Sequence, residues 1–415
     1  MYLLTLISVI FPYFKLMKID FPEIKSNRIY AIDIIRALTM ILMIFVNDLW
    51  SLKDIPSWLG HVERGVDGMG LADTVFPAFL FIVGLSLPYA IDARRKKGDT
   101  EWQLILHVVV RSLALLIMGV FLVNGETINA SGTGIPRFIW NTICCLSFIL
   151  IWNQYSEKDD SRFVFFNKLL AVVSLLCLAY YYRGGKDDAL TLFSPQWWGI
   201  LGLIGWAYLA AGIITVLSRN NLFVILAGWL VFAIISMVSH AGLFPESLHF
   251  IPDAIRGGTL AGLSMGGVLT SFIFQYFRNK NDHQSMYLVL SAMAGLLILA
   301  SILVRPYWGL AKLGATPAWL FLCSALTLIL FLFIYWLVDI KGKSAWFDFV
   351  RPAGTNTLLC YLIPYFSYAF MRLFHLHLPA FLLNGVVGLI KSLGFALLCV
   401  FITGRLAKGG IKLKL

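Results

Sequence analysis

Apolar stretches alternate with short polar segments along nearly the whole chain. A helix needs about 20 apolar residues to cross the hydrocarbon core of a bilayer, and the stretches are close to that length. The pattern therefore predicts an all-α, polytopic protein, a bundle of about 12 transmembrane helices whose main partner is the lipid bilayer. The predicted spans are residues 31–50, 73–92, 103–123, 137–153, 164–181, 197–217, 222–240, 257–277, 286–304, 317–339, 353–373 and 380–403.

Composition and charge strengthen this prediction. The chain is 59% hydrophobic and only 13% charged, with a mean hydropathy of +0.81, whereas soluble domains carry about 25% charged residues. The net charge of +11 does not indicate nucleic acid as a partner, because the Lys and Arg residues lie in short loops. Most of them fall in one alternate set of loops, which predicts that both termini are cytoplasmic.

This topology divides the chain into three parts. Residues 1–30 are expected to be an N-terminal cytoplasmic or interfacial segment, residues 31–403 the membrane domain, and residues 404–415 a basic cytoplasmic tail. The six cysteines all lie inside apolar stretches with no CxxC pair, so neither a disulfide framework nor a zinc site is indicated.

The polar loop after the first span is the leading candidate for chemistry. The span ends at Asn47, the loop carries His61, and the next span begins near Asp73. A carboxylate can orient an imidazole that acts as a base or nucleophile, and an asparagine amide can donate to a developing oxyanion. His61 could equally be a solvated loop histidine, and Asp73 could be the N-cap of the second span. The charge pattern predicts that this loop faces the outside.

Two arginines inside predicted spans form a second candidate set. Arg36 lies three residues after Asp33, so the two can pair as a structural ion pair. Arg111 lies well inside its span, where it suits binding of an anionic group from the cytoplasmic side or snorkelling to the interface. His375 and His377 together with His61 form a weaker, three-histidine metal hypothesis, because the sequence does not place them close together.

The segments on either side of the His61 loop resemble a known family. AIDIIRALTM (31–40) with IFVN (44–47), and LADTVFPAFLFIVG (71–84), are similar to two signatures of the heparan-α-glucosaminide N-acetyltransferase family. Ala37 stands where the family has glycine, and the interval from His61 to Asp73 is slightly longer. Weaker similarity continues through Arg111-Ser112 and the segments 197–209, 310–319, 335–342 and 352–362.

The resemblance implies acetyl transfer across a bacterial inner membrane. Acetyl-CoA is the implied co-substrate, bound from the cytoplasm, and an amino sugar or glycan on the outer face is the implied acceptor. His61 matches the catalytic histidine, as general base or transient acetyl carrier, Asn47 its asparagine partner and Asp73 the carboxylate of the second signature.

The resemblance also suggests residues that bind the donor, acetyl-CoA. Arg36 and Arg111 match family arginines and are candidates for the CoA phosphates, and Asn356, in PAGTNTLLCYL (352–362), is grouped with them. Relative to the family core, the spans within 137–181 are an extra hairpin. No metal is implied, and the sequence leaves a homodimer open.

Other functions fit the same pattern. The protein could be an acyl-CoA-dependent O-acyltransferase of envelope glycans, which differs only in the acceptor. Twelve spans also suit a secondary transporter of a small sugar-like solute, although no internal repeat between the halves is evident. A non-catalytic binding or scaffold subunit is the remaining alternative.

Overall fold

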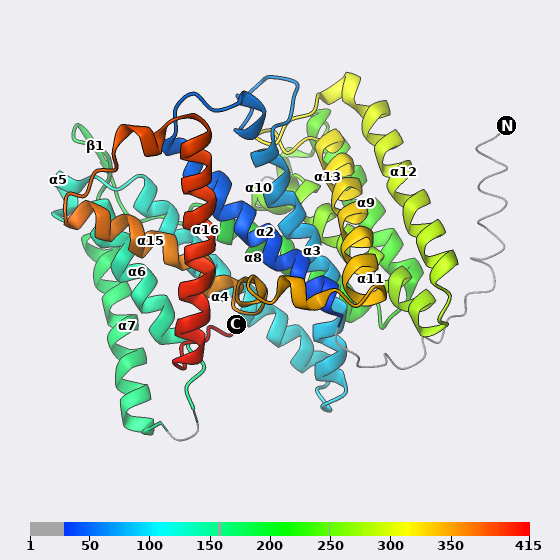
Figure 1. The fold of residues 1–415 in the computed structure, drawn as a ribbon, viewed down its shortest axis with the longest axis horizontal. Coiled ribbons are helices and arrows are strands. Elements are labelled where there is room, and N and C mark those ends of the chain that lie inside the picture. Colours follow the sequence, from blue (N-terminus) through cyan, green and yellow to red (C-terminus); the bar gives the residue numbers. More distant parts are fainter. Residues whose placement is uncertain (1–28, 157–158, 249) are drawn as a thin grey trace.

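The computed structural model describes residues 29–156, 159–248 and 250–415, which form a helical bundle with one small β-hairpin (Figure 1). The predicted N-terminal segment 1–30 lies almost wholly outside the described residues. The long helices are α2 (Tyr30–Asp48), α3 (Leu71–Arg95), α4 (Glu101–Glu126), α6 (Arg137–Trp152), α7 (Ser161–Tyr181), α8 (Ile200–Leu217), α9 (Leu222–His240), α11 (Thr259–Asn279), α12 (His283–Trp308), α13 (Pro317–Tyr335), α15 (Thr357–Leu373) and α16 (Gly385–Lys408).

Short elements connect these helices. They are α5 (Ala130–Thr133), α10 (Asp253–Arg256), α14 (Arg351–Thr355), a π-helical turn at Trp336–Ile340 that prolongs α13, and 3-10 turns at Leu49–Ser51, Ser57–Leu59, Glu246–Leu248, Ser344–Phe347 and Ala380–Leu383. Strands β1 (Gly184–Lys186) and β2 (Ala189–Thr191) pair antiparallel, with Gly185 opposite Leu190. The sequence analysis did not predict this hairpin, because three-residue strands leave no periodic signal.

Ten helices in the described part of the chain are long and apolar enough to cross a membrane, which confirms the all-α polytopic class. The other two predicted spans are helical but different in detail. Predicted span 137–153 is the 16-residue helix α6. Predicted span 353–373 is broken at Asn356, whose non-helical backbone (φ −125°, ψ 50°) separates α14 from α15.

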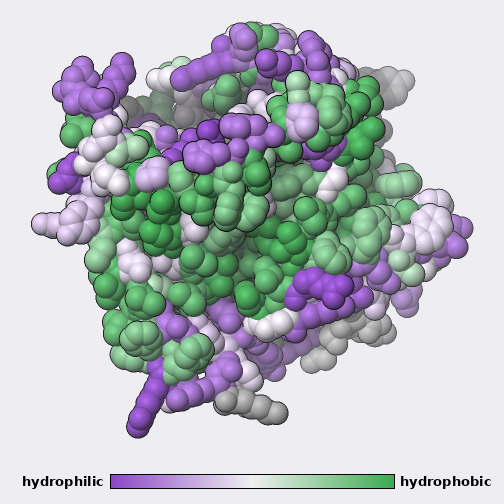
Figure 2. All heavy atoms as spheres, turned by 60° about the vertical axis from the view of Figure 1, so that its left-hand side comes forward, coloured by the Kyte–Doolittle hydropathy of each residue, from purple (hydrophilic) through white to green (hydrophobic). Residues whose placement is uncertain are grey.

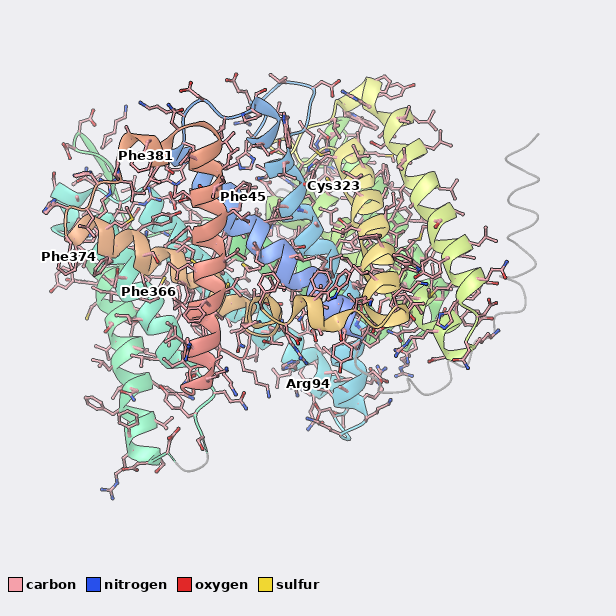
Figure 3. All side chains as sticks on the ribbon, in the orientation of Figure 1. Phe45, Arg94, Cys323, Phe366, Phe374 and Phe381 are labelled. Carbon is pink, nitrogen blue, oxygen red and sulfur yellow. The ribbon has the colours of Figure 1, made fainter. Side chains whose placement is uncertain are left out.

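The bundle has two polar ends and an apolar waist. Figure 2 shows a broad hydrophobic band across the face in view, with hydrophilic side chains gathered above and below it. The loop that contains His61 lies at the upper end in Figure 1, whereas the turn after α3 and the C-terminus lie toward the lower end. Figure 3 places Arg94 at that lower end and Cys323 in the upper half. The candidate loop and the basic turn are therefore at opposite ends of the bundle.

The C-terminal segment is bound to the turn between α6 and α7. The N–H of Gln154 donates to the carbonyl of Lys412 at 2.8 Å, and the N–H of Lys414 donates to the carbonyl of Trp152 at 3.0 Å. Asn153 and Leu413 form the antiparallel bridge between these two hydrogen bonds. The predicted tail 404–415 thus includes the last turn of α16 and an ordered strand-like end.

Close contact between α3 and α11 forms the centre of the bundle and positions the start of α3. A Cβ on Gly84 of α3 would lie 1.8 Å from the carbonyl oxygen of Ser264, and one on Gly267 of α11 would lie 1.9 Å from that of Phe81. Small residues let helix backbones approach closely in membranes. The small residues of segment 257–272 allow this close contact.

Replacing Gly267 with alanine is expected to destabilise the bundle by about 1–3 kcal/mol, because the added methyl group has to separate two backbones. Gly295 of α12 is a matched control, since a Cβ there meets nothing within 4 Å. Thermal unfolding in detergent should show a lower Tm for Gly267→Ala and an unchanged or higher Tm for Gly295→Ala. Equal Tm values for the two variants would contradict the close contact.

Candidate active site

A histidine–carboxylate pair lies where the upper loop meets the first turn of α3. Nδ1 of His61 is 2.7 Å from Oδ1 of Asp73. The Asp73 side chain is only 1% exposed, whereas that of His61 is 46% exposed. Two electronegative atoms at this distance need a proton between them, so Nδ1–H donates to the carboxylate. The other ring nitrogen, Nε2, therefore carries the lone pair that a base or nucleophile needs.

The chain around Asp73 explains why its carboxylate is fixed. Helix α3 begins at Leu71, with Gly70 as the N-cap, so Asp73 is the third residue of the helix and not its cap, as the sequence analysis had considered. Oδ2 of Asp73 accepts hydrogen bonds from the N–H groups of Gly70 (3.0 Å) and Val62 (3.1 Å). A carboxylate at this position also interacts favourably with the helix N-terminus. One side chain thus closes the loop, begins the helix and orients His61.

Glycine is required where the loop closes. A Cβ on Gly70 would lie 2.0 Å from the carbonyl oxygen of Gly60. Gly60, which precedes His61, is therefore in direct contact with Gly70, which precedes helix α3. This contact helps to bring His61 back to Asp73.

A second carboxylate ties the loop to the connection between α12 and α13. Asp67 accepts a 2.7 Å hydrogen bond from the N–H of Leu310 and two 3.1 Å contacts from Nε of Arg305. The hydrogen bond from Leu310 and that from the Arg305 side chain hold the pKa of Asp67 below its usual range. The N–H of Gly68 also donates to the carbonyl of Leu310 at 2.9 Å. The loop is thereby held against a segment more than 200 residues away in sequence.

This connection brings Lys312 to the dyad. Nζ of Lys312 lies 3.3 Å from Nδ1 of His61 and 3.5 Å from the carbonyl oxygen of Ala72. Burial lowers the pKa of Lys312, while Asp73 acts in the opposite direction. The sequence analysis did not select Lys312. The one signal in the sequence that could have identified Lys312 is its position in segment 310–319, where the family resemblance is weaker.

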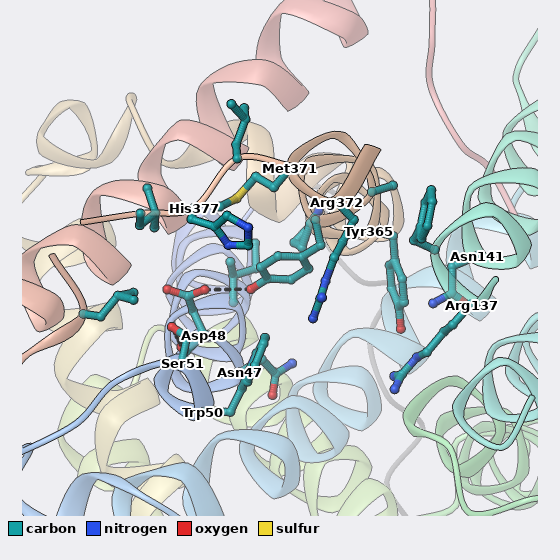
Figure 4. A pocket seen from close by; sticks show the side chains of 18 of the residues that line it. Asn47, Asp48, Trp50, Ser51, Arg137, Asn141, Tyr365, Met371, Arg372 and His377 are labelled. Carbon is teal, nitrogen blue, oxygen red and sulfur yellow. Dashed lines mark hydrogen bonds between the residues drawn. The ribbon is translucent and has the colours of Figure 1, made fainter. Parts of the chain in front are cut away.

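Asn47 faces a large cavity and lies apart from the dyad. In the described part of the chain, no hydrogen bond joins Asn47 to His61 or Asp73, although the sequence grouped the three residues. The cavity of about 1210 Å³ is lined mainly by the end of α2, by α15 and by α6, and Asn47 also lines an adjoining cavity of about 240 Å³ (Figure 4). Asn47 is thus at the junction of two cavities.

The wall of the larger cavity holds a buried ion pair next to Asn47. Asp48 is 3% exposed and accepts from Nζ of Lys391 (2.6 Å), the Ser392 hydroxyl (2.6 Å) and the Tyr368 hydroxyl (2.8 Å; dashed in Figure 4). Lys391 lies inside the predicted span 380–403 and was not selected as a site residue from the sequence. Asp48 was missed, although it follows Asn47 directly, because a single helical step turns its side chain toward α16.

The three residues predicted to bind CoA do not form one cluster. Arg36 forms the predicted pair with Asp33 (3.5 Å) and also donates to the carbonyl of Gly354 (3.0 Å) and the Ser86 hydroxyl (2.7 Å). Asn356 lies two residues beyond Gly354, whose carbonyl accepts from Arg36, at the break between α14 and α15.

Arg111 lies on α4 and packs against α8. Its guanidinium is 4.8 Å from the centre of the Tyr208 ring, and its buried Nε has no hydrogen-bond partner among the described residues. An unpaired buried donor is costly, so this nitrogen is suited to an external acceptor.

The described residues contain no group of three or more His, Cys, Asp or Glu side chains arranged to hold a metal ion. His375 and His377 line the large cavity, whereas His61 is not among its lining residues. The three-histidine hypothesis therefore has no geometric support.

Comparison with known proteins agrees with the resemblance. The family described as "Domain of unknown function (DUF5009)" matches residues 28–256, which is more than half of the chain. The chain belongs to the DUF5009 family. The match includes both members of the dyad and Arg111, while Lys312 and Lys391 lie beyond it.

The chain is also a distant relative of two characterised enzymes. It is 34% identical over 103 residues to mouse (Mus musculus) heparan-alpha-glucosaminide N-acetyltransferase, and 32% identical over 101 residues to the human (Homo sapiens) protein of that name. These matches span 24% and 23% of this chain and 14% of each relative. The chain therefore matches a small part of the relatives' length.

Proposed function

We propose that this DUF5009 protein is a transmembrane acetyltransferase of a bacterial inner membrane. It takes the acetyl group from acetyl-CoA on the cytoplasmic side and transfers it to an amino sugar or glycan on the opposite side. The observation that carries the proposal is the 2.7 Å His61–Asp73 hydrogen bond, which leaves Nε2 of a half-exposed imidazole free to react. The location of this dyad at the end of the bundle away from the basic turn supports the sidedness.

The dyad can act as a general base. The acceptor amine attacks the thioester carbonyl while Nε2 of His61 removes one of its protons, and Asp73 stabilises the resulting imidazolium. The new bond joins the acceptor nitrogen to the acetyl carbon, the bond from carbon to sulfur breaks, and the proton passes from His61 to the departing thiolate. The products are an N-acetylated sugar and CoA.

The same geometry supports a covalent route. Nε2 attacks the thioester carbonyl, CoA leaves as the thiolate, and an acetyl-imidazole then delivers the acetyl group to the acceptor. The two routes differ in one observable. Labelled acetyl-CoA supplied without acceptor should leave acid-labile label on His61 only in the covalent route.

Positive charge at the lower end suits the CoA phosphates. Arg94, Arg111 and Lys414 lie close enough to His107 of α4 to act on it electrostatically, and one acidic residue, Asp99, opposes them and pairs with Arg94 at 2.9 Å. The unpaired Nε of Arg111 supplies a donor for a phosphate oxygen. Arg36 is bound within the protein by Ser86 and Gly354, so we place Arg111 ahead of Arg36 and Asn356 as the residue that contacts CoA.

The large cavity suits the part of an acceptor glycan that lies away from the reacting amine, because His61 does not line this cavity. Its lining combines aromatic rings with amide, hydroxyl and charged groups, which matches a sugar ring bearing hydroxyl and amino groups. Asn47 faces this space and is available to hydrogen-bond to the substrate. Cavity volume leaves room for a sugar larger than a monosaccharide, so a glycan terminus also fits.

Transfer in detergent tests the proposal. Purified protein is given acetyl-CoA labelled in its acetyl group, followed by glucosamine. We expect labelled N-acetylglucosamine and an equal amount of free CoA thiol. Failure to bind acetyl-CoA, together with failure to form product, would contradict the proposed function.

The buried Asp48–Lys391 pair favours a second candidate, a secondary transporter. Ionisable groups inside a membrane bundle are typical of ion or proton pathways, and this pair borders the cavity. A transporter would move unmodified glucosamine into vesicles in the absence of acetyl-CoA. Uptake that needs Lys391 but not His61 would replace the enzyme proposal with this one.

A further inference from the structure

Lys312 is held at the dyad by contacts on several sides of its loop. Besides the Asp67 contacts, the carbonyl of Gly314 lies 2.8 Å from Nε2 of His240, and the Ala315 carbonyl accepts from the Thr259 hydroxyl at 2.5 Å. Ala315 itself has a positive φ of 50°. A loop fixed by α9, α11 and the upper loop together places the lysine side chain with little freedom.

Lys312 has no role in holding the imidazole by a hydrogen bond. Nδ1 of His61 already donates its proton to Asp73 at 2.7 Å, so it has no lone pair left for the ammonium group at 3.3 Å. The closest acceptor that the structure offers Nζ is the Ala72 carbonyl at 3.5 Å. Burial lowers the pKa of Lys312 and the charge of Asp73 raises it; in its ammonium form the lysine places a positive charge beside the ring.

We propose that Lys312 is a positioning residue for His61: its charge beside the imidazole disfavours the protonated ring and keeps Nε2 available as the reacting atom. Asp73 alone would stabilise the imidazolium, and a histidine that stays protonated cannot act as a base or nucleophile. The opposed charges of Asp73 and Lys312 let the carboxylate orient the ring without saturating it with a proton. The catalytic meaning of this inference rests on the proposed function, but the effect of the Lys312 charge on His61 does not.

Other charged or titratable groups also lie around the dyad, but we assign the effect on His61 to Lys312. Cys323 of α13 is buried and lies close enough to Asp73 and Lys312 to interact with both. The charges of Arg305 and Asp67 are paired with each other. Glu63 and Arg64 are exposed residues of the same loop and carry opposite charges.

Titration of His61 tests the inference directly. Histidine Cε1 resonances of protein labelled in its histidines are followed against pH, and the His61 signal is identified by its loss in His61→Gln. Lys312→Met should raise the His61 midpoint by about one pH unit, since a nearby like charge shifts a titration by roughly that much. Lys312→Arg keeps the charge and should stay close to the wild-type midpoint.

Lys53→Met is the matched control, because Lys53 is an exposed lysine in the same upper loop and its loss changes the net charge equally. Its His61 midpoint should move by much less than that of Lys312→Met. An unchanged or lower midpoint in Lys312→Met would overturn the inference. If that variant does not fold, Lys312→Gln is measured in its place, with the same expected direction.

A second readout links the charge to turnover. The acid limb of the pH profile of kcat/KM should move to higher pH in Lys312→Met, by the same amount as the His61 midpoint. A protein that shows the midpoint shift but transfers no acetyl group would refute the proposed function and leave the electrostatic role of Lys312 intact. Normal transfer with an unmoved acid limb would refute the role of Lys312 alone.

Discussion

Replacing His61 with alanine should lower acetyl transfer by about 10³-fold or more, because a positioned base or nucleophile contributes roughly 10²–10⁴ to the rate and His61 is the imidazole that Asp73 orients. The loss should appear in kcat, with the KM for acetyl-CoA changed little, since the charges assigned to the CoA phosphates lie at the other end of the bundle. Steady-state kinetics with labelled acetyl-CoA and glucosamine measure both quantities.

His283→Ala is the matched control for this variant. His283 is an exposed residue at the start of α12, at the end of the bundle away from the dyad, and its loss should leave kcat within about twofold of wild type. Added imidazole should partly restore His61→Ala, because the imidazole of His61 is half exposed and its removal opens the site. A fall in both variants alike would show that the assay reports protein damage.

Asp73→Asn is the second change with a large expected effect. The carboxylate accepts from three N–H groups, on His61, Val62 and Gly70. An asparagine offers one oxygen and one NH₂ group. If the NH₂ group faces His61, Nδ1 becomes an acceptor and the proton moves to Nε2, which is then no longer a base. We expect kcat to fall by about 10²–10³-fold.

The same substitution at Asp67 separates chemistry from loop closure. Asp67→Asn weakens the tie between the upper loop and Arg305 but leaves the dyad itself in place. Its kcat should fall by less than about tenfold, because the Leu310 contact to an oxygen remains available. Equal losses in Asp67→Asn and Asp73→Asn would indicate that both act only by holding the loop.

Much of the architecture follows from local patterns in the sequence. The apolar periods locate the helices, because each span needs a nearly continuous apolar stretch of fixed length. The break at Asn356 could not be seen in this way, since the polar residues Thr355, Asn356 and Thr357 are too few to interrupt an otherwise apolar stretch. The spacing of small residues in segment 257–272 is typical of close helix packing, but it does not show which helix is the partner.

The candidate site was only partly predictable for a related reason. His61 and Asp73 are twelve residues apart, and a short loop brings its two ends together at small entropic cost. Asn47 and Asp48 are neighbours, yet their side chains point to different surroundings, which depend on the rotation of α2 in the bundle. Lys312 is 251 residues from His61, and only the assembled fold brings it to the dyad.

Transfer across a sealed membrane tests the central claim most directly. Vesicles containing the protein are loaded with glucosamine, washed, and given labelled acetyl-CoA outside, so that only molecules with the donor side outward can react. The account predicts labelled N-acetylglucosamine inside the vesicles, CoA outside, and no product with His61→Ala. Product that forms only when glucosamine and acetyl-CoA are on the same side, or at the same rate in His61→Ala, would contradict it.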